Sequence, residues 1–194
     1  MGADDGSGRA RKGCRAALLM DERGQTTRTE RGTGTRTLGK DVTTPTLFVL
    51  NGPNLDHLGV REPAIYGHDT LADVERLCAA EAEAAGFALR FHQTHAEHEM
   101  IDWVHEARVG AAGIVLNPAA FTYAAYPLLD ALKMCDCPIL EVHISNIHRR
   151  EAEWRSKSIM TQAVTGIISG LGIHGYPLAI RHIAWLRARA NQGA

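Results

Sequence analysis

TLFVLNGPNLDHLGVREPAIYG, residues 46–67, is the segment that decides the fold. It opens with an apolar run at 47–50 and continues through the tetrapeptide NGPN at 51–54 into a turn-rich stretch that contains Arg61 and Tyr66. A short apolar run bounded by turn residues is typical of a buried strand. We therefore predict that a strand at 46–50 delivers a polar loop to the end of a sheet, where the loop is a mobile lid over an active site.

The rest of the chain alternates between helical and strand patterns. Helices are predicted at 70–86, 97–109, 127–134 and 176–190, and strands at 87–93, 113–117, 138–144 and 166–169. Thr70 and Asp73 are spaced like a capping box at the start of the first helix. Strands separated by helices of this length indicate right-handed βαβ units, and hence a parallel sheet covered by helices on both faces.

Composition excludes several classes of protein. A chain of 194 residues suits one α/β domain with a proper core, and a net charge of −1 gives no reason to expect nucleic acid or a membrane surface as a partner. No apolar run approaches the ~20 residues that span a bilayer, and no secretory signal is recognisable. Four cysteines at irregular spacing do not suggest a disulfide framework. We therefore predict a cytoplasmic protein.

Residues 1–45 differ in character from the remainder. They contain 8 Gly, 9 basic and 6 acidic residues, and no His, Trp, Tyr or Phe. Such a segment cannot bury enough apolar surface to offset the entropy of ordering it. We predict a disordered N-terminal extension at 1–45 and a single catalytic domain at 46–194.

Polar residues gather where the predicted strands end. NGPN follows the first strand, Asn117 ends the third, and the fourth contains Glu141, His143 and Ser145, which share one face if the strand continues through them. A carboxylate two residues before a histidine can orient the ring and support its charged form. His143 is thus either a candidate general acid or a buried histidine satisfied by the backbone.

Tyr66 and Arg61 lie in the same loop. A permanent cation close to a phenol favours the tyrosinate, which makes Tyr66 a candidate base. The alternative is an amphipathic residue that packs the loop onto the domain.

Histidines at 92, 95 and 98 recur at a spacing of three, but position 92 falls on a predicted strand and the others open a helix, so we predict no shared metal centre.

Several separated motifs resemble one family. LNGPNL at 50–55, REP at 61–63, YG at 66–67, LNP at 116–118, LEVHISN at 140–146 and GLG followed by GY at 170–176 are similar to the type II 3-dehydroquinate dehydratases, in the same order and spacing. The resemblance implies a flavodoxin-like three-layer sandwich with a five-stranded parallel sheet, dodecamers built from trimers, and no metal or organic cofactor. It implies dehydration of 3-dehydroquinate to 3-dehydroshikimate by anti elimination through an enolate, in the shikimate or quinate pathway.

The resemblance also implies the proton-transfer residues. By position, Tyr66 is the base, made anionic by Arg61, and His143 is the acid that protonates the departing hydroxyl, oriented by Glu141. Asn54 holds the water that stabilises the enolate oxygen. A proton next to a ketone requires such a base and a preorganised donor for the enolate, so the assignment is chemically coherent.

Further positions correspond to substrate contacts. The backbone amides of Ile144 and Ser145, with the Ser145 hydroxyl, would bind the substrate carboxylate through charge-assisted hydrogen bonds. Asn117 and Arg155 would contact ring hydroxyls. Asp130 would reach a neighbouring subunit's site across the trimer interface.

Some positions depart from the family pattern. Tyr123 stands where a substrate-contacting histidine is usual, Ala119 where glycine is frequent, and Leu129 where arginine is usual. A one-residue insertion brings Arg155 into place. Tyr123 can still donate a hydrogen bond to substrate, so variation within true dehydratases is one interpretation. A relative that acts on a related cyclic hydroxy-keto acid is the second.

Two further alternatives stay open at the level of sequence. A non-catalytic flavodoxin-like binding protein would keep the scaffold while its pocket changed at Tyr123 and Leu129. The pair Arg149-Arg150 either binds phosphate with Arg155 or lies on a helix surface or subunit contact.

Overall fold

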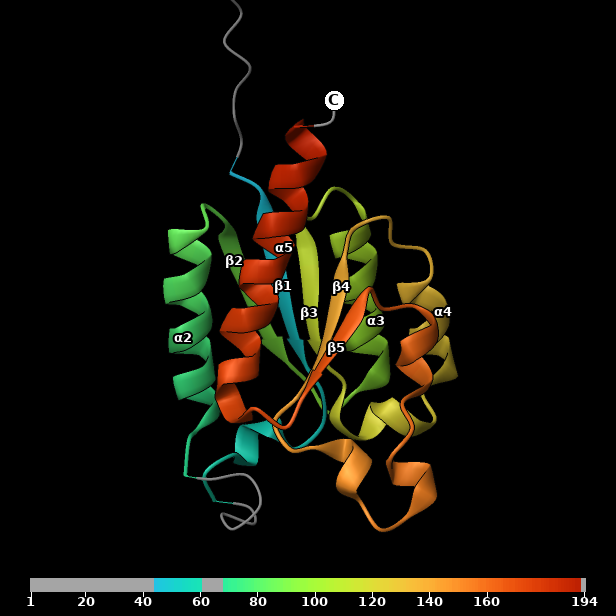
Figure 1. Cartoon of the computed structure of the whole chain (residues 1–194). Coiled ribbons are helices and arrows are strands. Elements are labelled where there is room, and N and C mark those ends of the chain that lie inside the picture. The colour runs from blue at the N-terminus through green and yellow to red at the C-terminus, as the bar shows by residue number, and fades with distance from the viewer. Residues whose placement is uncertain (1–43, 61–67, 193–194) are drawn as a thin grey trace, which may run out of the picture. The chain divides into compact units, whose positions relative to one another are not determined.

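The structure, a computed structural model, describes residues 44–60 and 68–192. In this part of the chain one parallel sheet has the strand order β2-β1-β3-β4-β5 (Figure 1). The strands are β1 (Thr46–Asn51), β2 (Ala88–Gln93), β3 (Gly113–Asn117), β4 (Ile139–His143) and β5 (Gly166–Ser169). The α-helices between and after them are α2 (Leu71–Ala84), α3 (Glu97–Arg108), α4 (Tyr126–Leu132) and α5 (Gly175–Gln192).

The sheet forms the middle of three layers. Helices α2 and α5 cover one face and α3 and α4 the other, as Figure 1 shows. Because successive side chains of a strand point to opposite faces, β1 contributes Leu47 and Val49 to the core under α2 and α5, and Phe48 and Leu50 to the core under α3 and α4. All four side chains are buried. The predicted flavodoxin-like sandwich with five parallel strands is confirmed.

This strand order places a reversal between β1 and β3, which are neighbours although β2 lies between them in sequence. The connections from these two strands leave in opposite directions, which opens a crevice beyond their carboxyl ends. The fold therefore predicts a ligand site at the ends of β1 and β3, where Asn51 and Asn117 face each other in register.

Helix α2 begins with the predicted capping box. The Thr70 hydroxyl accepts a hydrogen bond from the Asp73 backbone N–H at 3.2 Å, and the Asp73 carboxylate accepts one from the Thr70 N–H at 3.0 Å. The Thr70 hydrogen bonds hold the pKa of Asp73 at about 2. Past the helix, Gly86 has a φ of 75°, in the left-handed region that glycine adopts without a steric cost.

Several predicted boundaries are wrong by one or two residues, and three of them have a clear cause. Phe87 does not belong to β2, because its N–H bonds back to Ala82 and closes the end of α2. Helix α4 ends at Leu132 rather than 134, since the N–H of Met134 bonds three residues back in a turn. Strand β4 ends at His143.

The end of β4 affects the predicted site. Gly170 and Gly172 donate their backbone N–H groups to the carbonyls of His143 and Ile144, and the chain bends away from the sheet there. Ser145 therefore lies beyond the strand, and the prediction that it shares a strand face with Glu141 is wrong.

Two predictions fall on residues that the structure does not describe. Arg61 and Tyr66, with most of the predicted lid, lie outside the described residues, as does nearly all of the predicted N-terminal extension. The extension and its boundary with the catalytic domain therefore stay predictions. Among the described helices, none is long and apolar enough to cross a membrane.

Candidate active site

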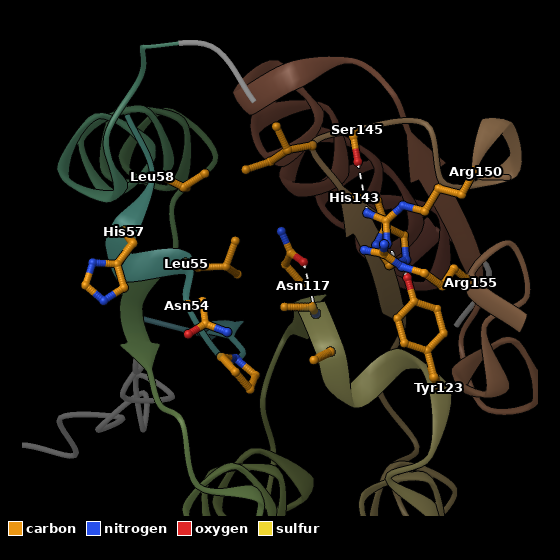
Figure 2. A pocket seen from close by; sticks show the side chains of 14 residues that line it. Asn54, Leu55, His57, Leu58, Asn117, Tyr123, His143, Ser145, Arg150 and Arg155 are labelled. Atoms are coloured by element: carbon orange, nitrogen blue, oxygen red, sulfur yellow. Dashed lines mark hydrogen bonds between the residues drawn. The ribbon is translucent and has the colours of Figure 1, made fainter. Parts of the chain in front are cut away.

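A cavity of about 160 Å³ opens beyond the carboxyl ends of β1, β3 and β4 (Figure 2). In the close-up, the residues after β1 lie on one side, Asn117 lies in the middle, and Tyr123 with two arginines lies opposite. The lining residues are Pro53, Asn54, Leu55, His57, Leu58, Asn117, Ala119, Ala120, Tyr123, His143, Ile144, Ser145, Arg150 and Arg155. The cavity thus occupies the crevice that the strand order predicts.

A histidine backed by a buried carboxylate faces this cavity. His143 and Glu141 lie on the same face of β4, and the His143 Nε2 is 2.7 Å from the Glu141 Oε1. Their side chains are 5% and 0% exposed. Because an ionised carboxylate only accepts, the Nε2 atom carries the proton that forms this bond, and the Nδ1 atom is the ring nitrogen left to exchange a proton. The geometry suits general acid–base chemistry.

Asn117 is fixed by a buried hydrogen-bond network. Its Nδ2 donates to the Tyr176 hydroxyl at 2.8 Å, and that hydroxyl donates to the Asn51 Oδ1 at 2.8 Å. Tyr176 is fully buried, and burial raises its pKa far above the usual phenol value. The phenol therefore stays protonated and fixes the side-chain amides of Asn51 and Asn117 at the ends of β1 and β3.

The loop after β1 approaches β3 closely. A Cβ on Gly52 would lie 2.3 Å from the Pro118 carbonyl oxygen, so only glycine fits there. The Gly52 N–H donates to the Asn117 carbonyl at 2.8 Å. This contact holds the start of the loop at the reversal in strand order between β1 and β3.

Asn54 follows in a left-handed conformation with a φ of 64°, which asparagine tolerates better than most residues. Its backbone N–H donates to the His95 Nδ1 at 3.3 Å, and the His95 Nε2 lies 3.3 Å from a carboxylate oxygen of Asp56. Asn54 thus lines the cavity from a loop that is held by two contacts, the first between Gly52 and Asn117 and the second between Asn54 and His95.

Tyr123 and two arginines form the opposite wall. One guanidinium nitrogen of Arg150 donates to the Tyr123 hydroxyl, and another donates to the Ser145 hydroxyl at 3.1 Å. Tyr123 also packs edge-on against Trp154 at a centroid distance of 5.2 Å, and Arg155 lies over the Trp154 ring. The wall is therefore cationic and aromatic, and suits an anionic ligand.

The structure brings most of the predicted site residues together. Those that line the cavity are Asn54, Asn117, Tyr123, His143, Ile144, Ser145 and Arg155. Glu141 lies behind His143. Asp130 is exposed on α4 and does not line this cavity. Arg61 and Tyr66 lie outside the described residues.

Sequence reasoning missed Arg150. The sequence left it between phosphate binding and a surface or subunit contact, whereas the structure places it in the cavity wall. A cation in the loop directly after a strand that ends in site residues was the available signal. Tyr176 was noted only as part of a family motif, and its bonds to Asn51 and Asn117 had no local signal.

Metal ligation is not indicated by the described residues. Between residues 44–60 and 68–192, no three His, Cys, Asp or Glu side chains are grouped so that they could hold a metal ion. The donors that do converge, an imidazole backed by a carboxylate and two guanidinium groups, suit proton transfer and anion binding rather than cation binding.

Fold and site together define a flavodoxin-like α/β protein with a carboxylate-backed histidine in a cationic pocket, at the reversal in strand order between β1 and β3. Comparison with known proteins identifies the family. The sequence profile described as "Dehydroquinase class II" matches residues 45–184. The chain therefore belongs to the class II dehydroquinase family.

Individual relatives agree with the profile. The chain is 56% identical over 143 residues to a 3-dehydroquinate dehydratase of Methylobacterium radiotolerans, a match that covers 74% of this chain and 95% of the relative. The crystal structure of a type II dehydroquinase from Propionibacterium acnes has a TM-score of 0.68 at 41% identity, covering 73% of this chain and 97% of that one. A type II dehydroquinase from Butyrivibrio crossotus has a TM-score of 0.69 at 35% identity, covering 72% and 97%.

Ala119 now has a structural description. It stands where the family pattern often has glycine, and its φ of 49° lies in the left-handed region. An L-residue with a Cβ pays roughly 1–2 kcal/mol for that conformation. The backbone at Ala119 thus has a shape that glycine favours.

Proposed function

We propose that this protein is a 3-dehydroquinate dehydratase, a hydro-lyase that converts 3-dehydroquinate to 3-dehydroshikimate. The observation that supports it best is the Glu141–His143 pair at the edge of a cationic cavity in a chain of this family. Relatives named 3-dehydroquinate dehydratase at about half identity favour this activity over the two alternatives raised by Tyr123.

The proposed reaction is an anti elimination in two steps. Tyr66, kept anionic by Arg61, takes the proton from C2, and the electrons of the C–H bond form the enolate. A water held by Asn54 donates to the enolate oxygen and stabilises its charge. The enolate then expels the C1 hydroxyl, which leaves as water with a proton from His143, while Glu141 supports the imidazolium. The two side chains balance the protons, so the proposed chemistry needs no cofactor.

Binding of the substrate is proposed to use the loop after β4. The Ser145 hydroxyl and the backbone amides of Ile144 and Ser145 bind the carboxylate, next to the Arg150 guanidinium that already donates to Ser145. Asn117, fixed by Tyr176, contacts a ring hydroxyl.

The opposite wall supplies the other substrate contacts. We place Arg155 and Tyr123 against the remaining ring hydroxyls. Since Arg150 donates to the Tyr123 oxygen, the phenol proton stays free to donate to substrate.

Assembly and cellular role belong to the same proposal. We propose a homo-oligomer, a dodecamer built from trimers, in which the exposed Asp130 on α4 reaches a neighbouring subunit's cavity. We place the enzyme in the cytoplasm and in the shikimate or quinate pathway.

The test compares two histidine variants of the full chain. With 3-dehydroquinate as substrate, absorbance of the conjugated product grows with wild-type protein, and His143→Ala lowers kcat by about 10²- to 10⁴-fold because the general acid is lost. His148→Ala, an exposed histidine five residues away, serves as the matched control and keeps wild-type kcat. If His143→Ala and His148→Ala turn over alike, the proposed acid is wrong.

A further inference from the structure

The buried Glu141 carboxylate has a second hydrogen-bond donor besides His143. Its Oε1 atom accepts from the Ser158 hydroxyl at 2.6 Å as well as from His143 at 2.7 Å. The Oε2 atom has no partner among the described residues. A carboxylate that is 0% exposed is costly to keep ionised unless donors satisfy it. Ser158 therefore supplies one of only two donors seen in the described part of the chain.

The direction of the Ser158 hydroxyl is determined by a third residue. Ser158 precedes the short 3₁₀ helix Ile159–Gln162, and its oxygen accepts the Met160 N–H at 3.1 Å. With that lone pair occupied by Met160, the hydroxyl proton points to the Glu141 oxygen. Ser158 is half-buried and does not line the cavity, so it has no contact with a ligand there.

The two residues that flank Glu141 in the sheet register, Leu116 of β3 and Ile167 of β5, are apolar. Met160 is fully buried in the same apolar cluster as Leu116. His143 is the one titratable group hydrogen-bonded to the carboxylate in the described residues. None of these apolar side chains can replace the hydrogen-bond donor that is lost when Ser158 is substituted.

We propose that Ser158 is a positioning residue of the acid pair. Its hydroxyl holds the Glu141 carboxylate ionised and aimed at the His143 Nε2, so that the histidine is oriented and charged when it protonates the leaving hydroxyl. The inference rests on the proposed function, which assigns His143 as the acid, and extends the pair to a relay of three side chains that starts outside the cavity.

The first test removes only the hydroxyl. Ser158→Ala lowers kcat about 10-fold, since roughly one charge-assisted hydrogen bond is lost, and changes KM less than about 2-fold, because Ser158 does not touch substrate. A hydrogen bond to the ionised form favours that form, so its loss lets the carboxylate take up a proton at higher pH. The acidic limb of the kcat profile therefore moves to higher pH. Ser158→Thr, which keeps the hydroxyl, restores both the rate and the profile.

A matched control removes a hydroxyl from the other end of β4. The Thr165 hydroxyl accepts the Ile139 N–H at 3.1 Å. Ile139 is the first residue of β4, and His143 is the last. Thr165→Val keeps wild-type kcat and pH profile. A Ser158→Ala protein that loses kcat with an unmoved acidic limb, or that matches Thr165→Val, contradicts the proposal. If Ser158→Ala does not fold, Ser158→Cys supplies a weaker donor and is expected to move the limb part of the way.

A readout without turnover separates this inference from the function. The ring nitrogens of His143, observed by ¹⁵N NMR in the full chain, titrate differently in Ser158→Ala and in wild type if Ser158 acts through Glu141. Identical titration curves refute the positioning role even if both proteins are active. Wild-type protein that never turns over 3-dehydroquinate contradicts the proposed function, while a changed titration curve still supports the hydrogen-bond relay.

Discussion

Replacing Tyr176 by phenylalanine tests the network that holds the strand ends. The change removes one oxygen atom and with it two buried hydrogen bonds of 2.8 Å. The Asn51 Oδ1 and the Asn117 Nδ2 are then left without the partner they have in the wild type. A buried polar atom without a partner costs about 1–3 kcal/mol, and partial re-pairing of the two neighbouring amides reduces the sum. We expect the free energy of unfolding to fall by about 2–4 kcal/mol.

The assay is equilibrium unfolding in urea at fixed protein concentration, since oligomerisation affects apparent stability. In a domain of this size the same loss lowers Tm by roughly 4–16 °C. Tyr126→Phe is the control, because Tyr126 is 61% exposed and loses no buried bond. A loss below about 0.5 kcal/mol for Tyr176→Phe would refute the claim that the phenol locks the two strand ends.

Alkaline pH separates the phenol from other contributions. Because burial raises the pKa of Tyr176, the unfolded chain ionises this group first as pH rises above about 10. Wild-type stability then falls by about 1.4 kcal/mol per pH unit from this group, whereas below that pH the contribution is fully present. The difference between wild type and Tyr176→Phe should shrink accordingly above pH 10, and a constant difference would contradict the burial of the phenol.

Three further predictions concern single residues. Burial raises the pKa of the Cys78 thiol to about 12. After alkylation at pH 8, peptide mapping should therefore find Cys78 unmodified in native protein and modified in urea. Equal labelling in both conditions would show that Cys78 is accessible in the native protein. The buried Thr122 hydroxyl has no partner among the described residues, so Thr122→Val should leave the free energy of unfolding unchanged or raise it by up to about 2 kcal/mol, and a fall would reveal a partner. Ala119→Gly relieves the left-handed conformation and should raise the free energy of unfolding by about 0.5–1 kcal/mol in the same urea assay, whereas a decrease would contradict strain at Ala119.

Much of the fold was predictable because its signals are local. The strand patterns, the capping box at Thr70 and the helical spacing of Val74, Cys78 and Ala82 each depend on a few neighbouring residues. The order of elements then indicated a parallel sheet, and the pairing of the Glu141 and His143 side chains followed from a two-residue spacing.

The rest depended on distances along the chain that local patterns do not encode. Tyr176 and Asn51 are 125 residues apart and meet only because α5 packs across β3, the strand next to β1. Arg149 and Arg150 look alike in sequence, but the 3₁₀ helix Ile147–Arg149 turns only Arg150 into the cavity wall. Ser145 lies outside β4 because the chain bends away from the sheet after His143. There the backbone N–H groups of Gly170 and Gly172, in the segment after β5, bond to the carbonyls of His143 and Ile144.

The most direct test of the proposed mechanism follows a label. Full-length protein is incubated with 3-dehydroquinate that carries deuterium at C2, in the position anti to the C1 hydroxyl, and the product is examined by NMR. A base and an acid on opposite faces of the ring predict 3-dehydroshikimate that has lost the deuterium. Product that retains the label, or no product from folded protein, would contradict dehydration by Tyr66 and His143.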